Sequence, residues 1–249
     1  MSNDQPLILS IETATRAGGV AVARGEAVLA AIDGDAAVSH STNLLEMINE
    51  SLRHAAVNLA EVDLFAVAVG PGSFTGLRIG LATAKAFAAH LRRDVVGVPT
   101  LAAVAHASQM TGNIVALLPA GRGEVFAQRF TISEGVVTSI DDPQHLSPRA
   151  VAEKYAAVAA LNFAGEGVAM IREAVAQTSV CDEADADHRL KSVPPTLSLA
   201  PSIAVLGFRQ YQEGKSVAPD DLRAVYVRAS DAEINERWQQ QKLQQPAAK

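Results

Sequence analysis

One segment, residues 70–80 (GPGSFTGLRIG), constrains the fold more than any other because it places glycines between a strand pattern and a helix pattern. Upstream, residues 64–69 form an uninterrupted apolar run of strand length, which is typical of a strand covered on both faces. Downstream, apolar residues recur at helical spacing as far as residue 91, and Ser73 and Thr75 are candidate N-caps. A strand, a glycine turn and a helix in this order predict an α/β protein.

The glycine segment fits two uses, and the sequence leaves both open. A turn that exposes the first N–H groups of a helix can bind an anion. The candidate anion-binding residues are Gly70, Gly72, Ser73 and Thr75. Small residues four positions apart instead form a helix ridge that allows close packing, either inside the fold or across a subunit boundary. The ridge residues are Gly76, Gly80, Ala84 and Ala88.

The order of predicted elements runs through the chain twice. The first half reads as a hairpin, a third strand, a helix, a strand, the glycine-opened helix and a strand, at residues 7–23, 27–32, 43–56, 64–69, 73–91 and 95–98. The second half repeats this order of strands, glycine turn and helices between residues 114 and 177, and a helix over 197–212 is expected to pack back on the first half. The expected domains are therefore 1–102 together with 197–228, and 103–196, followed by a polar tail at 229–249.

Composition excludes several classes of function. The net charge is −6 and no stripe of lysine and arginine appears, which disfavours autonomous binding to nucleic acid. Cys181 is the single cysteine, and none of the six histidines lies three or four residues from another, so neither an internal disulfide nor a helical histidine pair for a metal is expected. The first residues lack a basic leader, and no apolar run is long enough to span a membrane, so we expect a cytoplasmic location without membrane insertion.

With the glycine segment, the opening Ile11-Glu12-Thr13-Ala14-Thr15 and the repeated element order, the chain resembles the TsaB (YeaZ) family over residues 7–228. Further matches are His40, residues 123–125 and residues 226–228. The resemblance implies a duplicated actin-like ATPase (ASKHA) fold, with two domains of mixed sheets flanked by helices. It also implies the dimerisation subunit of the bacterial complex that forms threonylcarbamoyladenosine at position 37 of tRNA.

Two departures bear on nucleotide binding. Related families usually carry Asp in the first turn and Asp-Ala-Arg in the second hairpin, where this chain has Glu12 and Pro119. Paired aspartates in these turns serve the metal and the phosphates in the active kinases of the superfamily, and proline has no carboxylate to offer. We therefore expect no cofactor on this chain alone, no catalytic residue and no metal ligand set, with ATP and magnesium in partner subunits.

The resemblance implies a non-catalytic scaffold that supports its catalytic paralogue TsaD, with the ATPase TsaE docking on the pair, a homodimer when the chain is alone, and tRNA contact only through the complex. An autonomous ATP-dependent small-molecule kinase is the alternative, and a self-associating structural protein is a third possibility. The subunit contact is expected on the helices at 43–56 and 73–91. The expected contact residues are Leu44, Leu45, Ile48, Leu52, Gly76, Arg78, Gly80, Ala84 and Ala88.

Single charged residues near the motif have several interpretations. Arg78 lies one turn into the glycine-opened helix, where the helix dipole disfavours a cation. Its partner could be a carboxylate across a subunit contact, a phosphate or an internal acid. His40 could contact a substrate or serve as a local hydrogen-bonding group, and Glu12 is expected to hydrogen-bond at the end of its strand.

Overall fold

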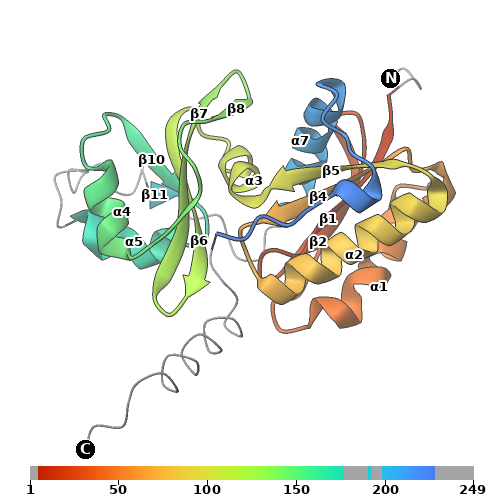
Figure 1. The fold of residues 1–249 in the computed structure, drawn as a ribbon, viewed down its shortest axis with the longest axis horizontal. Coiled ribbons are helices and arrows are strands. Elements are labelled where there is room, and N and C mark those ends of the chain that lie inside the picture. Colours follow the sequence, from red (N-terminus) through yellow and green to blue (C-terminus); the bar gives the residue numbers. More distant parts are fainter. Residues whose placement is uncertain (1–4, 177–189, 192–197, 228–249) are drawn as a thin grey trace, which may run out of the picture.

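The apolar runs of the sequence become the central strands of two mixed β-sheets (Figure 1). The computed structural model describes residues 5–176, 190–191 and 198–227. The first sheet has the strand order β3-β2-β1-β4-β5. Its strands are β1 (Leu7–Glu12), β2 (Gly19–Arg24), β3 (Ala27–Asp33), β4 (Leu64–Gly70) and β5 (Asp94–Pro99). β1, β2 and β3 pair antiparallel as consecutive hairpins, whereas β1, β4 and β5 run parallel.

The second sheet repeats this topology. Its strands are β6 (Gly112–Gly121), β7 (Glu124–Ser133), β8 (Val136–Ser139), β9 (Gln144–Leu146), β10 (Leu161–Ala164) and β11 (Leu190–Lys191). Read as β8-β7-β6-β10-β11, the strand order of the second sheet matches the order β3-β2-β1-β4-β5 of the first. The pairing directions match as well, since β6, β7 and β8 pair antiparallel and β6, β10 and β11 pair parallel. The repeated element order expected from the sequence is therefore confirmed. β9, which pairs with β7, was not expected.

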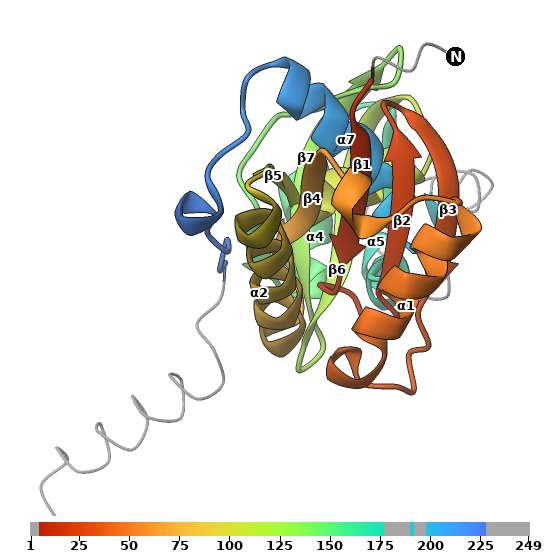
Figure 2. The same ribbon diagram turned by 90° about the vertical axis from the view of Figure 1, so that its right-hand side faces the viewer.

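Helices cover both faces of the first sheet (Figure 2). The helices in the described residues are α1 (His40–His54), α2 (Phe74–Leu91), α3 (Thr100–Ala107), α4 (Pro148–Tyr155), α5 (Val168–Ala176) and α7 (Ala200–Gln212), with short 3-10 turns at Leu59–Glu61 and Pro219–Asp221. Adjacent strand residues point to opposite faces of a sheet. Ser10 donates its hydroxyl to the Ala200 carbonyl of α7, while the neighbouring Ile11 faces α2 at Gly80. α7 therefore covers one face, and α2 packs on the other beside α1.

The second sheet uses the same alternation to join two cores. Val115 and Leu117 of β6 pack with α4 and α5 in a separate apolar cluster. Ala116 and Leu118 point the other way, into the main core that is continuous with the first sheet. The two halves of the molecule therefore share one hydrophobic core across the interdomain boundary.

Three elements tie the halves together. α3 contacts strands of both sheets, so the boundary expected after residue 102 falls inside this helix. Arg209 of α7 makes a two-pronged ion pair with Glu26 at 2.7 and 3.0 Å and donates to the Gly135 carbonyl of the second half at 2.5 Å. The segment 222–227 leaves the first sheet, where Val225 N–H donates to the Val69 carbonyl at 2.7 Å, and crosses toward β6 (Figure 1).

No helix within the described ranges is long and apolar enough to cross a membrane. The expected loop at 182–195 and the expected tail at 229–249 fall almost wholly outside the described residues, apart from Leu190 and Lys191 of β11.

Candidate functional site

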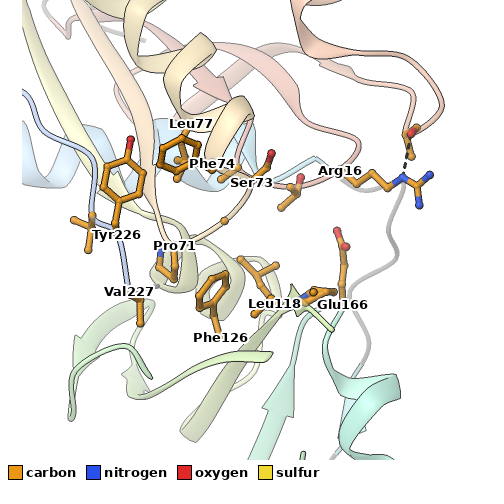
Figure 3. Close-up of a pocket in the computed structure, with 18 residues that line it drawn as sticks. Arg16, Pro71, Ser73, Phe74, Leu77, Leu118, Phe126, Glu166, Tyr226 and Val227 are labelled. Atoms are coloured by element: carbon orange, nitrogen blue, oxygen red, sulfur yellow. Dashed lines mark hydrogen bonds between the residues drawn. The ribbon is translucent and has the colours of Figure 1, made fainter. Parts of the chain in front are cut away.

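A cleft of about 570 Å³ lies between the two halves of the molecule (Figure 3). One wall comes from the β1–β2 turn and the glycine turn that opens α2, and the other comes from the β6–β7 hairpin and the turn before α5. The apolar side chains that line it include Pro71, Phe74, Leu77, Leu118, Phe126 and Val227. Tyr226 packs its ring on Phe74, with the ring centroids 5.0 Å apart, so segment 222–227 contributes to the same wall.

Glu12 ends β1 beneath this cleft and is fully buried. Its Oε1 accepts hydrogen bonds from the N–H groups of Ala14 at 2.5 Å and Thr15 at 2.8 Å, and its Oε2 accepts from the Thr15 hydroxyl at 2.6 Å. Burial raises the pKa of Glu12, although these hydrogen bonds and the nearby His40 act in the opposite direction. The expectation that Glu12 hydrogen-bonds at the end of its strand is confirmed.

The β1–β2 turn is braced from outside by contacts that do not involve Glu12. His40 Nε2 lies 2.9 Å from the Thr15 carbonyl oxygen, and Ser73 N–H donates to the Ala14 carbonyl at 2.7 Å. The Thr13 hydroxyl donates to the Gly76 carbonyl at 2.8 Å. His40 therefore serves as a local hydrogen-bonding group that links α1 to the turn.

The residues around the cleft do not fit magnesium and a nucleotide phosphate chain. The carboxylate of Glu12 is already occupied by its own turn, and Pro119 stands at the end of β6, the equivalent of the end of β1. The glycine turn has also committed two of its donors, since Gly70 N–H donates to Thr100 Oγ1 at 3.2 Å and Ser73 N–H to Ala14. Among the residues that the structure describes, no group of three acidic, histidine or cysteine side chains is arranged for a metal ion.

The contacts support the packing interpretation of the glycine segment. A Cβ on Gly72 would lie 2.4 Å from the Ala14 carbonyl oxygen, and one on Gly76 would lie 1.9 Å from the Thr13 carbonyl oxygen. A Cβ on Gly80 would lie 2.2 Å from Thr13 Oγ1. The glycines let the β1–β2 turn lie directly on α2. Ser73 caps this helix, since its hydroxyl accepts from Gly76 N–H at 3.2 Å, whereas Thr75 lies inside the helix.

This packing corrects most of the expected subunit-contact residues. The residues that lie inside the core of the chain itself are Leu44, Ile48, Leu52, Gly76, Gly80, Ala84 and Ala88. The sequence spacing was right for close approach, but at Gly76 and Gly80 the approaching element is the β1–β2 turn of the same chain. Leu45 and Arg78 remain on the surface, and Leu45 is 60% exposed. A subunit contact on the outer face of α1 and α2 stays a prediction.

No acid forms an ion pair with Arg78 among the described residues, whereas a carboxylate across a subunit contact and a phosphate stay predictions. Its guanidinium carbon lies 3.9 Å from the centroid of the Phe74 ring, one turn earlier in α2. A cation over an aromatic face is attracted by the ring quadrupole. Arg78 therefore covers the side chain that also packs against Tyr226 and lines the cleft.

Sequence reasoning missed Glu166, which faces the cleft from the turn before α5, with Arg16 on the opposite side (Figure 3). Burial, and secondarily the charge of Glu12, raises the pKa of Glu166. Arg16 donates through Nε to the Ala36 carbonyl at 3.2 Å. The Gly165-Glu166-Gly167 turn was a signal in the sequence, but only the fold brings it near Glu12, more than 150 residues earlier in the chain.

Comparison with known proteins finds relatives whose names agree with one another. The family model of TsaD, tRNA N6-adenosine threonylcarbamoyltransferase, matches residues 34–236. The "tRNA threonylcarbamoyladenosine biosynthesis protein TsaB" of Escherichia coli is 28% identical over 225 residues, which is 89% of this chain and 94% of the relative. The protein of the same name from Haemophilus influenzae is 35% identical over 123 residues, 48% of this chain and 51% of the relative.

Solved structures agree with these relatives. YeaZ from Pseudomonas aeruginosa superposes with a TM-score of 0.74 at 26% identity, over 89% of this chain and 99% of that chain. A crystal structure of a Pseudomonas aeruginosa protein described as similar to peptidase YEAZ gives a TM-score of 0.75 at 26% identity, over 90% of this chain and 100% of that chain. These neighbours confirm the expected duplicated actin-like fold class.

Proposed function

Because this chain belongs to the TsaB (YeaZ) family of tRNA threonylcarbamoyladenosine biosynthesis proteins, we propose that it is a non-catalytic subunit that supports TsaD. In this proposal TsaD transfers the threonylcarbamoyl group to adenosine 37 of tRNAs that read codons beginning with A, and TsaE docks on the pair. ATP and magnesium belong to these partner subunits.

One observation carries the non-catalytic assignment. The first half of the fold places one buried carboxylate, that of Glu12, behind the cleft wall, and this carboxylate accepts its hydrogen bonds from its own turn at Ala14 and Thr15. The second half has Pro119 at the equivalent strand end, and its side chain has no group that could ligate a metal or transfer a proton. Within the described part of the second half, Glu166 is the one acid that lines the cleft, so no second carboxylate stands beside it there to share a metal ion.

The surface proposed for TsaD, and for a second copy when the chain is alone, is the outer face of α1 and α2. The two helices lie side by side on one face of the first sheet (Figure 2). Leu45 is the most exposed large hydrophobic residue of the described chain and lies on this face. A protruding apolar side chain on a helix pair is a suitable anchor for a helical partner.

Contact with tRNA is proposed to occur through the complex only. The chain carries a net charge of −6, and tRNA binding requires many phosphates to be neutralised by basic side chains. Action on tRNA together with TsaD places the protein in the cytoplasm in this proposal.

Reconstitution tests the subunit role directly. Purified TsaD and TsaE with substrate tRNA, ATP, magnesium and the threonylcarbamoyl donor are assayed for modified adenosine with and without this chain. We expect modification to depend on the chain, and the chain alone to show neither ATP hydrolysis nor tRNA retention. Stoichiometric ATP turnover by the isolated chain would refute the proposal and support the alternative, a small-molecule kinase.

A matched pair of variants tests the surface. Leu45→Arg places a charge on the proposed contact, and Val136→Arg places the same charge on β8 of the second half, where the wild-type side chain is 57% exposed compared with 60% for Leu45. We expect Leu45→Arg to weaken association with TsaD and self-association at least tenfold in sedimentation equilibrium, and Val136→Arg to leave both unchanged. Equal constants for the two folded variants would place the contact elsewhere.

A further inference from the structure

Segment 222–227 covers part of the apolar wall of the cleft and is anchored at three points. At its start, Leu222 is 4% exposed and packs in the main core. In the middle, Val225 N–H donates to the Val69 carbonyl at 2.7 Å. Near its end, Tyr226 lines the cleft. The segment lies against the first sheet but is not one of its strands.

The contact of Tyr226 with the cleft wall lies close to the surface. Its ring packs on the ring of Phe74 with the centroids 5.0 Å apart and the planes inclined by 39°. Tyr226 is 47% exposed and Val225 is 42% exposed. A region with few buried contacts opens locally at a low cost in free energy. The end of segment 222–227 is therefore suited to leave the wall while the sheet beneath it stays folded.

Gly70 provides the space on which this segment lies. A Cβ at Gly70 would lie 2.4 Å from the carbonyl oxygen of Val225. The φ angle of Gly70 is 115°, in the region that favours glycine. The glycine turn thus both opens α2 and carries segment 222–227, so a change at the start of α2 is felt by the segment.

Arg78 supports the aromatic contact from α2. Its guanidinium carbon lies 3.9 Å from the centroid of the Phe74 ring, and the side chain is otherwise exposed on the outer face of the helix. A cation near a helix N-terminus is disfavoured by the helix dipole. A carboxylate offers a guanidinium charge-assisted hydrogen bonds, which are stronger than an exposed cation–π contact. A carboxylate brought to α2 would therefore draw Arg78 away from Phe74.

The charge of α2 fits a partner that supplies such a carboxylate. Between residues 74 and 91 the sequence contains Arg78, Lys85 and His90 but no acidic residue. Complementary charges favour the encounter of two surfaces and fix how they dock. The kind of partner that fits this helix is a protein surface that carries Asp or Glu opposite its first two turns.

We propose that the stack of Arg78, Phe74 and Tyr226 is a latch that holds segment 222–227 over the cleft, and that a protein docking on α2 with a carboxylate at Arg78 releases it. When the carboxylate takes the guanidinium, Phe74 loses its cation and Tyr226 loses part of its support. Segment 222–227 then leaves the wall, and the apolar interior of the cleft becomes accessible. The inference rests on the subunit role proposed above, with TsaD as the partner.

Hydrogen exchange of the isolated full chain, read by mass spectrometry in peptides that cover residues 222–227, tests the latch. We expect Arg78→Gln, which removes the charge, to exchange at least threefold faster than the wild type in this segment. Tyr226→Ala, which removes the ring, should exchange at least tenfold faster. Peptides from β4 should exchange as in the wild type, which shows that the variants are folded.

Two conservative variants separate the latch from general effects of substitution. Tyr226→Phe keeps the ring on Phe74, and Lys85→Gln removes another cation of α2 that is not part of the stack. We expect both to exchange like the wild type in segment 222–227. An Arg78→Gln protein that exchanges like Lys85→Gln overturns the latch.

Addition of saturating TsaD tests the release. Slower exchange in α2 marks docking, and we expect exchange of segment 222–227 in the wild type to become at least threefold faster, with no further increase in Tyr226→Ala. If TsaD protects α2 but leaves segment 222–227 unchanged or slows its exchange, the release is overturned. A TsaD that does not bind refutes the subunit role instead, and the variants of the isolated chain then decide whether the latch exists.

Discussion

Gly76→Ala tests the contact that positions the β1–β2 turn on α2. The added Cβ would lie 1.9 Å from the carbonyl oxygen of Thr13 and 3.2 Å from Cδ2 of His40. Alanine gains about 1 kcal/mol over glycine inside a helix, whereas overpacking costs about 1–3 kcal/mol and occasionally more. The obstacle is a backbone atom of a braced turn, so it cannot rotate away. We expect a net loss of about 2 kcal/mol in the free energy of unfolding.

Gly80→Ala provides the comparison in the same helix. Its Cβ would meet the Thr13 hydroxyl oxygen at 2.2 Å, and rotation of that side chain relieves the overlap. The rotation breaks the hydrogen bond from Thr13 to the Gly76 carbonyl, 2.8 Å long, at a cost of about 1 kcal/mol. The helix-propensity gain of about 1 kcal/mol offsets this loss. We therefore expect Gly80→Ala to be nearly as stable as the wild type.

Urea unfolding followed by circular dichroism measures both changes. A loss of about 2 kcal/mol also lowers the melting temperature by roughly 4–8 °C for a chain of this size. Ala82→Gly, at an exposed position of α2, calibrates the propensity difference and should cost about 1 kcal/mol. A Gly76→Ala protein as stable as the wild type, or more stable, would refute the account of turn-on-helix packing.

Three further variants probe charged groups. Burial raises the pKa of the Glu12 carboxyl group above its ordinary 4.5. The native state therefore keeps the carboxyl proton to higher pH than the unfolded chain does. The stability that the protonated carboxyl group contributes is lost as the pH rises through the raised pKa. Glu12→Gln should therefore gain stability relative to the wild type as the pH rises from 4.5 toward neutrality; a difference in urea midpoints that does not change with pH would contradict this. Arg209→Ala removes the ion pair with Glu26 and the hydrogen bond to the Gly135 carbonyl. Because the ion pair is partly solvent-exposed, we expect the free energy of unfolding to fall by only about 1 kcal/mol. We also expect small-angle scattering to show that the two halves are held together less tightly. Arg149→Ala, at a fully exposed pair, should change neither, and equal behaviour of the two arginine variants would argue against a tie between the halves.

The strands and helices around the glycine segment were predictable because their signals are local. The apolar run before Gly70 and the helical spacing after it appear as β4 and α2, and the repeated order of elements appears as two sheets of one topology. Hydrophobic periodicity identifies such elements directly. β9, a strand of three residues, has too few positions for a period to be seen.

The role of the glycine ridge was not predictable, because packing inside a domain and packing between subunits require the same small residues. The deciding partner is Thr13, more than 60 residues before Gly76 in the chain. On α1, the sequence likewise does not tell a buried leucine from an exposed one. Leu44 and Leu45 are adjacent and of the same type, yet Leu44 is 2% exposed and Leu45 is 60% exposed. The position of Glu166 in the cleft likewise depends on how the second sheet faces the first.

The covering of the first sheet by α7 has a consequence for how the protein is made on the ribosome. All five strands of that sheet lie between residues 7 and 99, but the helix that covers one of its faces begins at Ala200. Ser10, Ala66 and their neighbours on that face stay open to solvent until about a hundred further residues have been translated. The second sheet, in contrast, is encoded contiguously between residues 112 and 191 and emerges complete with α4 and α5. The half of the molecule that is translated first is therefore the half that finishes folding last.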